Sequence, residues 1–253
     1  MSIGDAEIKT QERVIRFFKD PEILGYQYIG NLSDYQNKNI KEDRLRQYLR
    51  LKGYADKLID AAVMQLQQEA GNLSRGVYDA NKTVYSRLKY GIPVSESPEK
   101  PPVTVELIDE ANPLNNDFAI AEEVTVVEQQ EKRPDLVIYL NGIAVAVIEL
   151  KRSSISVSEG IRQNLTNQKD SFIRGFFTTM QFCMAGNESE GLRYGTLLTG
   201  EKFYMEWKDD GFKEHEEERD PVDVRISKTC EGIENKLLKQ IYAMFDKERF
   251  IDL

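Results

Sequence analysis

The sequence contains one histidine, His215, and two cysteines, Cys183 and Cys230, among its 253 residues. A single histidine almost excludes zinc sites, Ser-His-Asp triads and imidazole acid–base catalysis, because each of these depends on histidine. The two cysteines form no metal-binding pattern and are typical of a reducing compartment. Any metal site in this chain is therefore expected to hold a hard cation through oxygen ligands.

Long apolar runs are also missing. No run approaches the roughly 18–20 residues of a membrane-spanning helix, and the first residues, MSIGDAEIKTQERVIRFF, lack the segments of a secretory signal. We therefore expect a cytoplasmic protein with no membrane partner. The glycine-rich patterns of phosphate-binding loops and dinucleotide-binding folds do not occur, so these residues give no support for ATP hydrolysis or dinucleotide binding.

The chain has no excess of positive charge; its net charge is −9. The chain as a whole would not attract a polyanion such as DNA, so a nucleic-acid substrate would need a local positive field or a partner. Between residues 151 and 174, five basic residues stand against two acidic ones, a local charge of +3. Charge runs of this kind are usually solvated faces, so this one is suggestive only.

The first 90 residues are predicted to be mainly helical. Apolar residues recur at three- and four-residue steps in 42–54 and 55–71, and 11–18 and 79–91 are further predicted helices. Residues 91–103 contain four prolines and are predicted to be loop.

From residue 103 the pattern changes to short segments rich in β-branched and aromatic residues, which predicts strands. These segments are 103–109, 118–129, 135–140, 143–151, 178–186, 192–199 and 202–208. A helix is predicted at about 157–170, beginning with a capping box of Ser156 and Glu159. An acidic loop is predicted at 213–221 and a last amphipathic helix at 234–245, and the final residues would suit the start of another helix, as in a piece of a longer protein.

The segment RPDLVIYLNGIAVAVIELKR, residues 133–152, consists of two apolar runs around Asn141-Gly142 with charges at both ends. In a regular strand, Ile143, Val145, Val147, Glu149 and Lys151 share one side. A carboxylate and an ammonium group emerging together can serve metal-dependent hydrolysis of a phosphodiester. A second carboxylate, Asp135, and the carbonyl of Leu150 would then complete the ligands of the cation.

The register of this hairpin tests the metal-site interpretation. A two-residue turn pairs residues whose numbers sum to 283, which puts Asp135 opposite Ile148 and on the face away from Glu149. A three-residue turn with a bulge at Gly142 raises the sum to 284 and puts Asp135 across from Glu149. The interpretation therefore predicts this bulge, or an equivalent kink near Pro134. The alternative is a solvated rim or a surface ion pair worth under about 1 kcal/mol, which spacing alone favours.

The pattern Pro134-Asp135, then Glu149-Leu150-Lys151, matches the PD-(D/E)xK nuclease signature. The surrounding residues, from KTQERVIRFF through KRPDLVIYLNGIAVAVIELKRSSISVSEGIRQNLTNQ to EKFYMEWK, resemble the amino-terminal region of type I restriction enzyme R subunits. The resemblance implies an α/β, restriction-endonuclease-like mixed sheet flanked by helices. It divides the chain into a helical section (1–95), a nuclease core (96–225) and a C-terminal helix (226–253) leading to a motor domain that this chain lacks.

The resemblance also implies Mg²⁺-dependent cleavage of double-stranded DNA after ATP-driven translocation. ATP would act only through the absent motor domains, and the partners would be methyltransferase and specificity subunits. A non-catalytic assembly module that docks such subunits remains an alternative. So does the hydrolysis of RNA or of a small phosphodiester, because the three charged residues recognise phosphate and not sugar.

The family's roles fall on specific residues of this chain. Asp135 and Glu149 become Mg²⁺ ligands, with the Leu150 carbonyl, and Lys151 becomes the catalytic lysine. Gln163 takes the first place of the family's Gln-x-x-x-Tyr motif, where it would contact the substrate or order the site, while Asn167 stands where tyrosine is usual. Without the resemblance, a solvated helix face is the simpler interpretation of these two residues. Glu12 would be either an added ligand or a charge that favours its helix dipole, and the second is the simpler interpretation.

Overall fold

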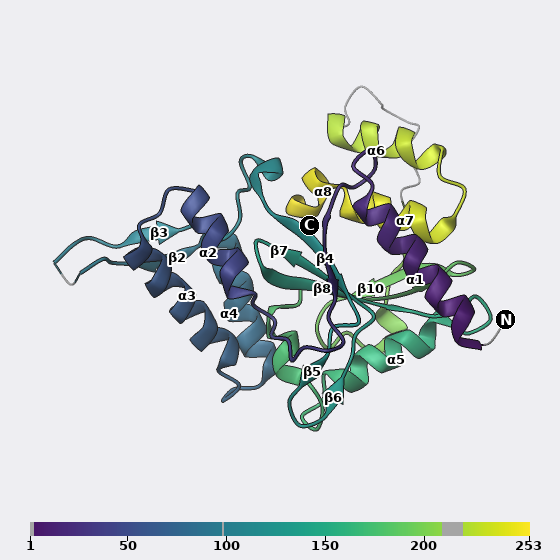
Figure 1. The fold of residues 1–253 in the computed structure, drawn as a ribbon, viewed down its shortest axis with the longest axis horizontal. Helices are drawn as coiled ribbons and strands as arrows, with labels where there is room; N and C mark the ends of the chain where they lie inside the picture. Colours follow the sequence, from purple (N-terminus) through teal and green to yellow (C-terminus); the bar gives the residue numbers. More distant parts are fainter. Residues whose placement is uncertain (1–2, 98, 209–219) are drawn as a thin grey trace.

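The computed structural model describes residues 3–97, 99–208 and 220–253 and is built around a six-stranded mixed sheet (Figure 1). The strand order is β1-β4-β7-β8-β9-β10. The strands are β1 (Gln27–Asn31), β4 (Phe118–Glu122), β7 (Leu136–Leu140), β8 (Ile143–Leu150), β9 (Phe182–Asn187) and β10 (Gly191–Gly195). β1 is parallel to β4 and β8 is parallel to β9, while the other neighbours are antiparallel.

Helices cover both faces of this sheet. α1 (Ile3–Lys19), α7 (Lys236–Phe245) and α8 (Lys247–Asp252) pack on one face, and α5 (Val157–Asn167) packs on the other. α2 (Glu42–Leu51), α3 (Asp56–Gly71) and α4 (Val77–Tyr90) lie beside the sheet, on the left of Figure 1, and α6 (Pro221–Glu231) lies against α7. This arrangement confirms the predicted α/β fold with a mixed sheet flanked by helices.

Apart from Glu149, the central strands β7 and β8 consist of apolar residues and Tyr139, because both of their faces are buried. Alternate residues of β7 enter two different apolar clusters: Ile138 packs with α1 and α7 residues, whereas Val137 and Tyr139 pack on the opposite face. No helix in the described ranges is long and apolar enough to cross a membrane.

Several predicted segments differ from the structure. In the segment predicted to be loop, β2 (Ile92–Val94) pairs with β3 (Val103–Val105) in a separate two-stranded ladder. β1 lies inside the section predicted to be helical. The strand predicted for 178–186 begins only at Phe182, because the 3-10 helix η2 (Arg174–Thr179) precedes it. The strand predicted for 202–208 is wrong: the 3-10 helix η3 (Glu201–Phe203) covers its start, and Met205 forms only an isolated bridge with Tyr194. A second short ladder joins β5 (Val126–Val127) to β6 (Glu131–Lys132), and η1 (Pro113–Asn115) precedes β4.

The predicted start of α5 is confirmed, but its predicted capping box is not formed. The Ser156 hydroxyl accepts a hydrogen bond from the Ser158 amide at 3.3 Å, while the Glu159 amide donates to the Ser156 carbonyl. The Glu159 carboxylate pairs instead with Arg162 at 2.8 Å. Of the predicted acidic loop at 213–221, residues 213–219 lie outside the described part of the chain; Asp220 caps α6 by accepting from the Val222 amide.

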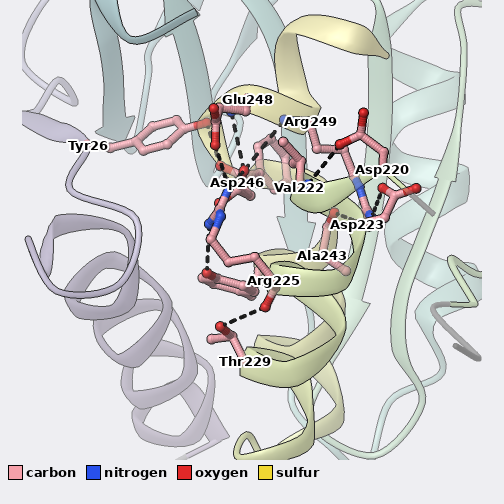
Figure 2. A network of polar contacts seen from close by, with 12 residues as sticks. Tyr26, Asp220, Val222, Asp223, Arg225, Thr229, Ala243, Asp246, Glu248 and Arg249 are labelled. Carbon is pink, nitrogen blue, oxygen red and sulfur yellow. Dashed lines mark hydrogen bonds and ion pairs between the residues drawn. The ribbon is translucent and has the colours of Figure 1, made fainter. Parts of the chain in front are cut away.

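A polar network fixes the three C-terminal helices to one another (Figure 2). Arg225 of α6 donates two hydrogen bonds to Asp246, at 2.7 and 2.8 Å, and a third to Glu248. Asp246 also accepts from the first amides of α8 and so caps that helix. The Tyr26 hydroxyl donates to the Phe245 carbonyl at 2.9 Å, which ties α7 to the segment before β1.

Candidate active site

The β7–β8 hairpin combines a two-residue turn with a bulge. Asn141 and Gly142 have φ values of 52° and 82°, as in the mirror-image turns that suit hairpins, and Leu140 pairs with Ile143. The register then shifts: Tyr139 pairs with Ala144 but Ile138 pairs with Ala146, so Val145 is the extra residue. The bulge predicted at Gly142 is therefore wrong in position. The register beyond the bulge is nevertheless the predicted one, because Leu136 pairs with Ile148 and their numbers sum to 284. Asp135 directly precedes Leu136, as Glu149 directly follows Ile148.

The bulge also changes which side chains share a face. Ile143 and Val145 enter the cluster on the α1 side, whereas Val147 enters the cluster on the opposite face. Glu149 lies on this second face, because a methyl group added to Gly160 of α5 would lie 3.4 Å from its Cβ. The prediction that the five odd residues from 143 to 151 share one side is therefore wrong.

The two carboxylates lie at the same end of the central strands. The Asp135 Oδ2 atom accepts a hydrogen bond from the Leu150 amide at 2.7 Å. Glu149 is fully buried, and its Oε2 atom accepts from Gln163 Nε2 at 2.6 Å. Its Oε1 atom is buried and has no hydrogen-bond partner in the described part of the chain.

Burial changes the protonation of both groups. Burial raises the pKa of Asp135 to about 6, against the opposing effects of the Leu150 amide and Lys151. It raises the pKa of Glu149 well above its usual value, and the negative charge of Asp135 adds to this effect. Two carboxyls whose negative charges oppose each other, one with an unpartnered oxygen, form a site that favours protons or a cation.

These donors fit a divalent cation of the Mg²⁺ type. An ionised, fully buried carboxylate costs several kcal/mol unless a partner compensates it, and Mg²⁺ prefers one or two carboxylates completed by water. Within the described ranges, no group of three or more His, Cys, Asp or Glu residues could hold a metal. That Asp135, Glu149 and the Leu150 carbonyl hold a cation stays a prediction from the sequence.

Lys151 follows β8 directly and reaches toward α1. Its Nζ atom lies 3.4 Å from Glu7 Oε1, and its side chain is 14% exposed. One turn later, Gln11 donates to Glu122 and Glu123, both at 3.1 Å. Glu12, which the sequence suggests as a possible added ligand on this helix, is exposed, and its carbonyl accepts from Arg16.

Glu7 and Gln11 were missed in the sequence, although a signal was present. They are four residues apart, which places them on one face of α1. That face continues into Val14 and Phe18, which are buried against the sheet. The sequence signal for these two residues is therefore that they continue the buried apolar face of α1 with polar side chains.

α5 forms the other wall of the site. Gly160 permits a close approach to β9, since an added Cβ would lie 2.9 Å from the Ala185 Cβ. Gln163 meets Glu149, and Asn167 is buried at 2% exposure, with its carbonyl accepting from the Ile173 amide. Both line a depression of about 460 Å³, here called the mouth. Its other lining residues are Lys132, Arg133, Lys151, Glu159, Arg162 and Thr166.

Comparison with known proteins gives consistent matches. Over 97 residues the chain is 33% identical to a provisionally named type I restriction enzyme MjaIXP endonuclease subunit of Methanocaldococcus jannaschii, covering 35% of this chain and 9% of that protein. It is 29% identical over 112 residues to the type I restriction enzyme SsaAORF53P endonuclease subunit of Staphylococcus saprophyticus, covering 42% and 12%. The chain thus spans about a tenth of these relatives. A family model described as type I restriction enzyme R protein N terminus matches residues 7–203, so the chain belongs to that family.

Proposed function

We propose that this chain is the Mg²⁺-dependent endonuclease domain of a type I restriction enzyme R subunit, with double-stranded DNA as its substrate. The observation that carries the proposal is the unpartnered, fully buried Oε1 atom of Glu149 beside the second carboxyl of Asp135. The names of the two relatives, both endonuclease subunits, support DNA as the substrate.

Each residue has a separate part in hydrolysis. Asp135 and Glu149 would hold the cation, which when bound activates water and polarises the phosphate. Gln163 fixes the orientation of the Glu149 carboxylate through the 2.6 Å hydrogen bond. Lys151 follows the same strand end as Glu149, where its ammonium can stabilise the negative charge that develops on the phosphate as water attacks in line.

The domain would act within a larger assembly. We propose that the cut follows ATP-driven translocation by motor domains outside this chain, in a complex with methyltransferase and specificity subunits. The net charge of −9 supports delivery of DNA by such partners, because this chain alone would bind a polyanion weakly.

Three alanine variants test the proposal in the assembled complex. Asp135→Ala, Glu149→Ala and Lys151→Ala should each lower DNA cleavage by about 10²–10³-fold or more, while ATP-driven translocation stays at the wild-type rate. Lys57→Ala, which removes an exposed lysine on α3, serves as the control and should cut normally. Normal cleavage by any of the three variants would contradict the role assigned to that residue.

A further inference from the structure

A second depression of about 600 Å³, here called the hollow, lies between the start of α4, the end of α5 and the loop after β10. Its basic residues are Arg75, Lys169 and Arg174, and its acidic residue is Asp170. Arg174 pairs with Asp170. Arg75 and Lys169 are exposed, and neither side chain has a hydrogen-bond or ion-pair partner among the described residues. The hollow therefore presents two free positive charges on a chain that is negative overall.

The hollow and the mouth are joined along α5. Arg162, Thr166 and Lys169 follow one another at four- and three-residue steps, so they lie along one face of the helix and the turn that follows it. Arg162 and Thr166 line the mouth, while Lys169 lines the hollow. Together the two depressions are lined by seven basic residues and two acidic ones, Glu159 and Asp170. In the mouth, however, Arg133 pairs with Glu123, Lys151 with Glu7 and Arg162 with Glu201. Among the described residues, the basic residues of the two depressions without an ion pair are therefore Lys132, Arg75 and Lys169.

Two exposed apolar side chains stand among these charges. Tyr78 is 59% exposed and Leu198 is 50% exposed, and both line the hollow. Leu198 has a φ of +60°, a strained conformation for a leucine. It is held there by Gln168, whose buried Oε1 atom accepts from the Leu198 amide at 2.7 Å. Exposed apolar groups among phosphate-binding cations are typical of surfaces that contact the grooves and sugars of nucleic acids.

We propose that the hollow is a second contact site for duplex DNA whose reacting phosphate lies in the mouth. Arg75 and Lys169 bind backbone phosphates, and Leu198 packs against the adjacent groove or sugars. The proposal rests on the proposed function, since it takes DNA as the ligand. In this arrangement, the two cations orient the duplex along α5.

The salt dependence of DNA binding tests the two cations. We would measure anisotropy of a fluorescein-labelled duplex against NaCl concentration in Ca²⁺, using the full chain. Each phosphate contact adds about −0.9 to the slope of log K against log salt, so Arg75→Gln/Lys169→Gln should make the slope less negative by about two. Affinity at low salt should fall about tenfold. Lys57→Gln/Lys228→Gln removes the same charge from exposed sites on α3 and α6 and should leave both values unchanged.

Leu198→Gly tests the apolar contact separately. Glycine adopts this φ without strain, so the loop keeps its shape. Affinity should fall while the salt slope stays at the wild-type value, because no charge is removed. Wild-type affinity in this variant would overturn the apolar contact.

The hollow is not a DNA site if Arg75→Gln/Lys169→Gln keeps the wild-type slope, if the control variant changes it equally, or if the wild-type chain does not bind the duplex. A parallel measurement of Mn²⁺ binding distinguishes failure of the second contact site from failure of the proposed function. Mn²⁺ binding that depends on Glu149, together with an unchanged salt slope, leaves the nuclease proposal standing and overturns only the second contact site.

Discussion

Glu149 is buried at the end of β8, with one carboxylate oxygen bound to Gln163 and the other unpartnered in the described part of the chain. Its neighbour Asp135 accepts a hydrogen bond from the Leu150 amide. In the absence of a cation, protonation of one carboxyl removes both the repulsion between the two negative charges and part of the cost of burying them. The same two carboxyls therefore link proton binding, metal binding and stability.

The first prediction concerns the stability of the metal-free chain. The pKa of Asp135 is raised from 3.8 to about 6, because burial and the negative charges of Glu123 and Glu7 outweigh Lys151 and the Leu150 amide. A raised pKa means that the folded chain binds the proton more tightly, so this stabilisation is present below about pH 4 and is lost as the pH rises through 6. Glu149 shifts in the same direction.

We therefore expect the free energy of unfolding in EDTA to fall between pH 4 and about 6, measured by urea titration. The variant Asp135→Asn/Glu149→Gln should show a smaller fall, because its amides do not titrate. Identical pH dependence in the two proteins would refute the coupling.

The second prediction concerns Gln163 as a positioning residue. Gln163→Ala leaves both oxygens of Glu149 without a partner, and loss of such an outer hydrogen bond typically costs 10–100-fold in metal affinity. We expect a loss of about this size in Mn²⁺ titrations, with the fold unchanged by circular dichroism. Gln67→Ala removes an equivalent glutamine that donates to Glu42 on the surface, and should bind Mn²⁺ like the wild type.

Among single residues, the sequence predicts the charged ones that stand at the ends of apolar segments. Asp135, Glu149 and Lys151 stand out because a charged side chain next to a buried apolar strand is costly unless a partner compensates it. In the structure the three residues lie at the same end of β7 and β8. Glu7 and Gln11 do not stand out, because α1 is far from β8 in the sequence and only tertiary packing brings them together.

Two elements, β8 and α5, determine the geometry of the site. The bulge at Val145 turns Glu149 toward Asp135, and Gly160 lets α5 approach closely enough for Gln163 to reach it. Neither feature supplies a reacting group. Both are features of the backbone that position a side chain of the site.

The third prediction concerns Gly160. Alanine is the better helix former by about 1 kcal/mol, but its Cβ would lie only 2.9 Å from the Ala185 Cβ. We expect Gly160→Ala to push α5 outward and lower Mn²⁺ affinity about as much as Gln163→Ala does. Adding Ala185→Gly removes the obstructing methyl group and should restore most of the affinity. Wild-type affinity in Gly160→Ala alone would show that close packing of α5 is not needed.

At the element scale, periodicity predicts the cores of the long helices and of the central strands. It cannot locate the bulge, because both faces of β8 are apolar and an extra residue leaves the pattern unchanged. The segment 202–208 resembles a strand in composition, yet only Met205 pairs, in an isolated bridge with Tyr194, while Tyr204 and Trp207 pack against apolar clusters. β2 and β3 form despite Pro93, since a two-stranded ladder leaves an outer edge where no amide is needed.

Of the apolar clusters among the described residues, the largest joins segments from most of the chain. It includes Phe18 of α1, Ile59 of α3, Ile148 of β8 and Ile241 of α7, so residues far apart in the sequence bury the same surface. The division at residues 95 and 225 stays a prediction from the sequence, since composition changes do not show which segments unfold together. The network of Arg225 and Asp246 further couples the last helices.

The fourth prediction follows from this shared cluster. We expect the metal-free chain to unfold in one cooperative transition, with the calorimetric enthalpy equal to the van't Hoff enthalpy. Tryptophan fluorescence at Trp207 and far-ultraviolet circular dichroism should report the same midpoint. Two separate transitions would show instead that the helical section or the C-terminal helices fold independently of the sheet.

The most direct test of the central claim is a calorimetric titration of the chain with Mn²⁺, in the wild type and in Glu149→Gln. The account predicts binding in the millimolar range or tighter for the wild type, stronger at pH 8 than at pH 5, and lost in the variant. Absence of binding, or equal binding by the two proteins, would contradict a cation site at Asp135 and Glu149 and would favour a nuclease-like scaffold that only docks partners.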